Sequence, residues 1–239
     1  AAVVYGHRPE HVMPGTDVVV ISSAVKYANP EVVRARELMV PVIPRAEMLA
    51  ELMRLKYGVI VAGTHGKTTT TSILAQVLHE AKLDPTVVIG GILNSTASNA
   101  QLGSGEWFLA EADESDGSFL RLSPTVAVIT NIDSDHLDHY ANYDEILIAF
   151  RTFLEKVPFY GAVCACIDDP GVQKVAPLIQ RRCITFGLSE GADVTATDIQ
   201  HHGALTHFTP VVFGKRIAPV QLHMPGRYNI TNALASVAV

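Results

Sequence analysis

The stretch "GTHGKTTTT", residues 63–71, places glycines, a lysine and threonine hydroxyls between an apolar run and a periodic segment. The run "YGVIVA" before it predicts a strand, and "SILAQVLHEA" after it predicts a helix. The start of such a helix attracts phosphate, so we expect Lys67 to reach the phosphates of a nucleotide and Thr68 to bind Mg²⁺. The usual G-x-x-x-x-G-K-[ST] spacing is not met, because the residue five before Gly66 is Val61. A glycine-rich turn with a solvated lysine is the structural alternative.

Two groups of polar residues follow the apolar strands predicted at 107–113 and 125–132. The first group contains Glu111, Asp113, Glu114 and Asp116, and the second contains Asn131, Asp133, Asp135, His136, Asp138 and His139. Ligands of open α/β sheets bind beyond the carboxyl ends of the strands, so we expect both groups to face the phosphate loop. Carboxylate oxygens suit Mg²⁺, whereas a histidine ligand suits Mn²⁺ or a second metal position. Solvated acidic loops are the structural alternative.

The segments that must position these groups alternate between strands and helices. Strands are predicted at 17–24, 40–44, 58–63, 86–91, 107–113, 125–132 and 161–168, and helices at 29–39, 45–57, 67–81, 144–157 and 171–182. Apolar strands between helices indicate an α/β fold with a parallel sheet covered on both faces. Further short strands at 183–188, 192–200, 204–214 and 216–224 predict appended antiparallel hairpins, before a last helix from residue 229.

The composition is that of a globular protein and argues against some classes of partner. The 239 residues are 48% hydrophobic and 18% charged, with a net charge of −6, so we expect no nucleic acid partner. No apolar run reaches the roughly 18 to 20 residues of a membrane-spanning helix, so we expect no membrane insertion. The three cysteines, Cys164, Cys166 and Cys183, are an odd and sparse set for a disulfide framework and indicate a reducing cytoplasm.

Five motifs occur in one order along the chain: "AGTHGKTTTT", "EADESDGSFL", "TNIDSDHLDHY", "IDDP" and "MPGRYNITNALA". Together they resemble the Mur ligases of bacterial peptidoglycan synthesis, whose phosphate loop has this short form. Upstream, "GHRPEHV" and "PVIPRAEMLAELMR" are similar to the second half of the family's UDP-sugar-binding N-terminal domain. The resemblance implies part of a Rossmann-like α/β domain at 1–56 and a central ATP-binding domain at 57–239. It also implies a fragment without the start of the first domain and without the C-terminal, amino-acid-binding domain.

The resemblance implies a function as well: ATP-dependent amide formation at the lactyl carboxylate of UDP-N-acetylmuramate, through an acyl phosphate. Ser115 favours the branch of the family that adds L-alanine over the one that recycles the cell-wall tripeptide. The catalytic residues would be Lys67, Glu111 and His136, and the ligands of Mg²⁺ or Mn²⁺ would be Thr68, Glu111 and His136. The ATP-binding residues would be Gly63, Thr64, His65, Gly66, Lys67, Thr68, Thr69, Asn229 and Asn232, and the UDP-sugar contacts would be His7, Ser22 and Ser23. Tyr228 stands where the family pattern has histidine.

Other functions and other roles for single residues stay open at this point. A kinase or GTPase shares the strand, loop and helix, although the chain has no N-K-x-D guanine motif. A nucleotide-binding module is the second alternative, because we expect the chain alone to be inactive without the amino-acid-binding domain. Taken singly, His136 also fits a capping or core histidine, and Asn229 and Asn232 fit helix N-caps.

Overall fold

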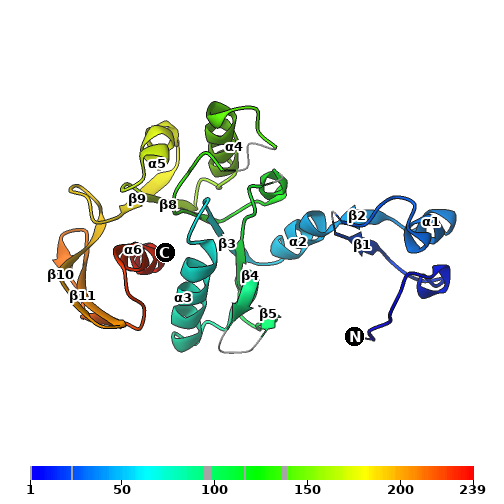
Figure 1. The fold of residues 1–239 in the computed structure, drawn as a ribbon, viewed down its shortest axis with the longest axis horizontal. Helices are drawn as coiled ribbons and strands as arrows, with labels where there is room; N and C mark the ends of the chain where they lie inside the picture. Colours follow the sequence, from blue (N-terminus) through cyan, green and yellow to red (C-terminus); the bar gives the residue numbers. More distant parts are fainter. Residues whose placement is uncertain (1, 23, 94–97, 116, 136–138) are drawn as a thin grey trace. The chain divides into compact units, whose positions relative to one another are not determined.

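The computed structural model of the chain describes residues 2–22, 24–93, 98–115, 117–135 and 139–239, with only the backbone described at 91–93 and 98. The chain divides into two compact units, Ala1–Leu52 and Met53–Val239 (Figure 1). Each unit is described by itself below.

The first unit is built on a pair of parallel strands. Its described elements are η1 (Pro9–His11), β1 (Val19–Ile21), α1 (Pro30–Glu37), β2 (Val42–Pro44) and all but the last residue of α2 (Arg45–Met53). β1 pairs with β2 in parallel, as a β-α-β connection requires. The side chain of Asn29 accepts a hydrogen bond from Glu31 N at 2.9 Å, and Pro30 opens α1. Asn29 is therefore the N-cap of this helix, and Pro30 takes the first helical position.

In its described residues, the second unit is an eleven-stranded mixed sheet with helices on its faces. Its strands are β3 (Tyr57–Ala62), β4 (Thr86–Leu93), β5 (Ser98–Gln101), β6 (Trp107–Glu111), β7 (Val126–Ile129), β8 (Ala162–Cys166), β9 (Arg182–Phe186), β10 (Val194–His202), β11 (Leu205–Val212), β12 (Lys215–Arg216) and β13 (Val220–Leu222). Its helices are α3 (Lys67–Glu80), η2 (Ser118–Arg121), α4 (Tyr143–Glu155), α5 (Pro170–Val175), η3 (Ala176–Leu178) and α6 (Arg227–Ala238).

The strand order is β12-β11-β10-β9-β8-β7-β3-β6-β4-β5, with β13 also paired to β11. All pairs from β4 to β10 are parallel, whereas β5 and the strands beyond β10 join antiparallel. The predicted parallel sheet with appended antiparallel strands is thus confirmed. Strand β5 has no counterpart in the sequence prediction, because "SNAQ" has neither the apolar run nor the alternation of a typical strand.

Helices cover both faces of the parallel region. Figure 1 shows α3 and α6 on one side of the strands and α4 and α5 on the other. Val59 and Val61 of β3 belong to the buried cluster that also contains Leu74 of α3 and Leu234 of α6. Successive residues of a strand point to opposite faces, so the buried Ile60 between them faces the other layer. Both faces of β3 are therefore in the core, which explains why "VIVA" has no polar residue.

Proline explains why two of the predicted elements are shortened or divided in the structure. The helix predicted at 171–182 is the short α5, followed by the 3₁₀ turn η3, because Pro177 has no N–H for an α-helical hydrogen bond. The strand predicted at 216–224 is divided into β12 and β13, and Pro219 lies in the break between them. The helix predicted at 45–57 also ends earlier, at Met53.

An aromatic cluster offers a test of the second layer of the core. Phe119 of η2 lies 5.3 Å from Phe150 and 5.2 Å from Phe153 of α4, measured between ring centroids, and all three side chains are buried. We expect Phe153→Ala to lower the free energy of unfolding by about 3 to 5 kcal/mol, because it removes buried contacts and leaves a cavity. Ile148→Ala on the same helix is the control, since Ile148 is 62% exposed and should cost less than about 1 kcal/mol. Urea unfolding followed by circular dichroism measures both, and equal losses would contradict this packing.

Candidate phosphate-binding site

The phosphate loop, residues 63–66, connects β3 to α3, and its two glycines are required by conformation and by space. Gly63 has φ +135° and Gly66 has φ +83°, values that side-chain-bearing residues rarely adopt. A Cβ at position 66 would lie 2.7 Å from Oδ1 of Asn232, and one at position 63 would collide with Thr130. Helix α3 begins at Lys67, so the unpaired N–H groups of its first turn and the positive end of its dipole lie at the loop. This is the geometry that binds phosphate.

Residues after β7 hold this loop in place. Oδ1 of Asn131 accepts a hydrogen bond from His65 N at 2.7 Å, and its Nδ2 donates to His65 O at 2.8 Å. Thr130 Oγ1 donates to the same carbonyl at 2.7 Å, and Thr64 Oγ1 accepts from Asp133 N at 2.9 Å. Asn131 and Asp133 belong to the predicted second polar group. Thr130 was missed, because a single threonine at the end of an apolar strand carries no sequence signal.

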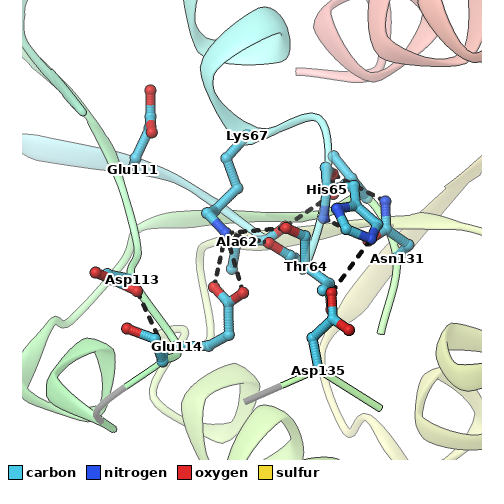
Figure 2. Close-up of polar contacts among 12 residues, drawn as sticks. Ala62, Thr64, His65, Lys67, Glu111, Asp113, Glu114, Asn131 and Asp135 are labelled. Atoms are coloured by element: carbon cyan, nitrogen blue, oxygen red, sulfur yellow. Dashed lines mark hydrogen bonds and ion pairs between the residues drawn. The ribbon is translucent and has the colours of Figure 1, made fainter. Parts of the chain in front are cut away.

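Lys67 is held by a buried carboxylate. Its Nζ donates to Glu114 Oε2 at 2.9 Å and Oε1 at 3.0 Å, to Gly63 O at 2.7 Å and, more weakly, to Thr64 O at 3.3 Å. The Glu114 side chain is only 2% exposed and that of Lys67 is 18% exposed. Tyr140 donates its hydroxyl to the Glu114 carbonyl at 2.8 Å. Figure 2 shows Glu114 extending to the ammonium group of Lys67, while Glu111 lies further back along the same segment.

Thr68 and Glu111 form the neighbouring contact, and their oxygens are suited to a divalent cation. Thr68 Oγ1 donates to Glu111 Oε2 at 3.1 Å. Glu111 Oε1 is buried and has no hydrogen-bond partner among the described residues. Burial raises the pKa of this carboxyl group, although hydrogen bonds from Thr68 and from the backbone of Gly90 act in the opposite direction. A carboxylate with a buried, unsatisfied oxygen beside a hydroxyl at a helix start fits the oxygen ligands that Mg²⁺ prefers.

The second polar group is described only in part. His65 Nε2 lies 3.5 Å from Asp135 Oδ2, in a pair with both side chains more than half exposed. The predicted metal ligand His136, together with Asp138, lies outside the described residues, as does Asp116 of the first group. Across the parts of the chain that the structure describes, no group of three or more His, Cys, Asp or Glu side chains is arranged to hold a metal ion.

Asn229 and Asn232 come to the loop from the far end of the chain. Both lie inside α6 and are 7% exposed, and Gly226 takes the cap position, so neither residue is an N-cap. Asn229 Nδ2 donates to Pro225 O at 2.7 Å, and Asn232 is the residue that a Cβ at Gly66 would meet. The structure therefore brings Asn232 against the phosphate loop, whereas Tyr228 is 69% exposed.

The residues predicted to contact a UDP-sugar belong to the first unit. His7 Nδ1 lies 3.0 Å from Glu31 Oε2, and His11 Nδ1 lies 2.6 Å from Glu31 Oε1. These two contacts lower the pKa of the Glu31 carboxyl group. The backbone carbonyl of Ser22 accepts from Val25 N in a turn, and Ser23 lies outside the described residues.

Two of the cysteines, Cys164 and Cys166, have a packing role. Cys164 and Cys166 are buried on β8, and burial raises the pKa of both thiols to about 12. Neither thiol is therefore suited to nucleophilic or metal chemistry at neutral pH.

None of the helices in the described segments has both the length and the hydropathy needed to span a bilayer.

A parallel sheet with a strand, a short glycine loop, Lys67 and Thr68 at a helix start defines a phosphate-loop nucleotide-binding domain. The family model of the Mur ligase middle domain matches residues 61–239, and that of the Mur ligase family, catalytic domain, matches residues 1–57. The chain belongs to the Mur ligase family.

Individual relatives agree with this assignment. The chain is 56% identical to the UDP-N-acetylmuramate--L-alanine ligase of Pelobacter propionicus, over 98% of this chain and 51% of that protein. It is 53% identical to the protein of the same name from Geobacter sulfurreducens, with the same coverage of both chains. The crystal structure of a UDP-N-acetylmuramate-alanine ligase from Thermotoga maritima matches with a TM-score of 0.81 and 32% identity, over 98% of this chain and 52% of that one. The chain thus spans about half the length of the curated relatives that it matches.

The pair of Lys67 and Glu114 leads to a prediction about stability. We expect Lys67→Met to lower the free energy of unfolding by about 3 kcal/mol, because it takes the ammonium group away from a buried carboxylate. The double variant Lys67→Met/Glu114→Gln should recover most of this loss, since the buried charge is then gone as well. Lys215→Met is the control, because Lys215 is exposed on β12. Urea unfolding at pH 7 measures all three variants. A Lys67→Met variant as stable as the native chain would show that the buried Glu114 carboxylate does not depend on Lys67 for its stability.

Proposed function

We propose that the whole protein is an ATP-dependent ligase that joins L-alanine to the lactyl carboxylate of UDP-N-acetylmuramate, in peptidoglycan precursor synthesis in the bacterial cytoplasm. The observation that carries the proposal is the short phosphate loop with Lys67 and Thr68, each bonded to a carboxylate from the end of β6. Membership of the Mur ligase family and the names of relatives at more than 50% identity support the choice of substrates.

The reaction needs activation because a carboxylate is a poor acylating agent. Its leaving group would be oxide, whereas transfer of the γ-phosphoryl group of ATP gives an acyl phosphate with phosphate as the leaving group. The amine of L-alanine then attacks the acyl carbon, an amide bond forms, and phosphate is released. The task of the protein is to position the reactants and offset their charge, which in phosphoryl transfer accounts for most of the catalysis.

Each loop residue has a part in this scheme. The ammonium group of Lys67 offsets charge on the phosphates, and the backbone of Gly63–Gly66 with the first turn of α3 binds their oxygens. Thr64, His65 and Thr69 are the remaining loop positions of the proposed ATP site. Thr68 and Glu111 would hold Mg²⁺ or Mn²⁺, with His136 as a further ligand by family resemblance. The cation would supply positive charge to the phosphoryl oxygens.

Residues outside the loop complete the proposed substrate contacts. Asn229 and Asn232 would meet the adenine, and the position of Asn232 against Gly66 supports a nucleotide that extends from the loop toward α6. His7, Ser22 and Ser23 of the first unit would contact the UDP-sugar. The chain alone would bind ATP with its metal but would not ligate, because the relatives are about twice its length.

The proposal is tested by phosphate release in the full-length protein. With ATP, Mg²⁺ and UDP-N-acetylmuramate present, we expect release to depend on L-alanine and to be much slower with L-serine, glycine or the recycled tripeptide. Lys67→Ala should reduce the rate by at least about 10³-fold, because a charge that stabilises the transferred phosphoryl group is lost. Lys215→Ala should retain the native rate.

The double variant Lys67→Ala/Glu114→Gln separates catalysis from folding, because it should be stable and still inactive. Undiminished turnover by Lys67→Ala would overturn the assigned role. Phosphate release with GTP and without L-alanine would favour the kinase or GTPase alternative.

A further inference from the structure

Glu114 makes different contacts from Glu111, the carboxylate that is suited to bind the metal. Glu111 bonds to the hydroxyl of Thr68, whereas Glu114 places both carboxylate oxygens within 3.0 Å of Lys67 Nζ. The Glu114 side chain is 2% exposed, so this charge lies in a site of low dielectric constant and acts strongly on its neighbour. Metal binding by Glu111 would not explain why a second buried carboxylate, that of Glu114, lies beside Lys67.

The hydrogen bonds of Lys67 show where its charge is directed. An ammonium group has three protons, and the structure provides acceptors for them at Gly63 O, Glu114 and Thr64 O. The contact with Thr64 O is the longest, at 3.3 Å, and is the one that a phosphate oxygen could replace at least cost. The contact with Glu114 is stronger, because both oxygens of a negatively charged carboxylate accept from the positively charged ammonium group, and it would persist.

The charges around the loop therefore do not favour a free polyanion. The charges of Lys67 and Glu114 cancel each other. Glu111, which accepts a hydrogen bond from the neighbouring Thr68, adds negative charge when it is ionised. Two unit charges about 5 Å apart interact by about 3 kcal/mol at an effective dielectric constant of 20, which is more than a hundredfold in affinity. A nucleotide whose charge is already reduced by a bound divalent cation meets much less of this repulsion.

We propose that Glu114 is a specificity-determining residue: by neutralising Lys67 it makes the loop select the metal complex of a nucleoside triphosphate over the free nucleotide. The inference rests on the proposed function insofar as that function places ATP at this loop. It adds that the selection is made by a residue that acts through its contact with Lys67. Specificity here is the difference between two affinities, so it is measured directly by binding.

The test is calorimetric titration of ATP into the 239-residue chain, once with Mg²⁺ and once with EDTA. In the native chain we expect Mg²⁺ to strengthen binding by at least about tenfold. In Glu114→Gln, which can still accept a hydrogen bond from Lys67, binding in EDTA should become at least about tenfold tighter while binding with Mg²⁺ changes less. In Lys67→Met/Glu114→Gln the pair is neutral again, and tight binding in EDTA should be lost.

The control is Glu155→Gln, which removes a carboxylate paired with Arg151 on the exposed side of α4 and should change neither affinity. A merely structural role of Glu114 would weaken binding in both buffers, and that result would overturn the inference. Equal affinities of the native chain in Mg²⁺ and EDTA would also overturn the inference, whether or not Glu114→Gln folds. Selective binding without L-alanine-dependent phosphate release in the full-length protein would instead remove the proposed function and leave this inference intact.

Discussion

The parallel pairing of β3 with both β6 and β7 is the constraint on which the candidate site depends. Val61 is opposite Glu111, and Ala62 is opposite Ile129. The ladder continues one step past the strands, because Ala112 N donates to Val61 O at 2.9 Å and Thr130 N to Ala62 O at 3.1 Å. The segments that follow β3, β6 and β7 therefore leave the sheet at the same edge. A shift in register would move Glu111 away from Thr68 as well as disturb the core.

At this edge the polar groups of the site hold one another in place through hydrogen bonds. The loop carbonyl of His65 accepts from Thr130 and Asn131, and the ammonium group of Lys67 donates to Gly63 O and Glu114. Such internal bonds reduce the reorganisation that a bound phosphate group would otherwise require. The buried pair of Lys67 and Glu114 is one of these contacts. An apolar pair of similar size would often give equal stability, so the presence of a charged pair is better explained by function than by folding.

The sequence contained enough to predict the sheet and the loop but few of the contacts between side chains. Apolar strands alternating with periodic helices define the parallel core, and the residues at the strand ends then fall at one edge by topology alone. The family resemblance grouped Glu111 with Thr68 as metal ligands, and the structure brings these two side chains together. The contact of Glu114 with Lys67 was not predicted, because it depends on the path of the chain after β6. The breaks at Pro177 and Pro219 were predictable from proline chemistry, whereas the short strand β5 depends on pairing with β4.

The threonine run after the loop shows how a functional segment and a packing segment share one helix. Thr68 is exposed at the helix start, whereas Thr70 and Thr71 are fully buried where α3 packs against α6. Ser236 Oγ of α6 donates to Thr70 O at 3.4 Å, one turn along from the approach of Asn232 to Gly66. Small β-branched side chains let the two helices come close, at a cost in helix propensity. Because α6 is far from the loop along the chain, the loop has the surroundings described here only once α6 has packed against α3.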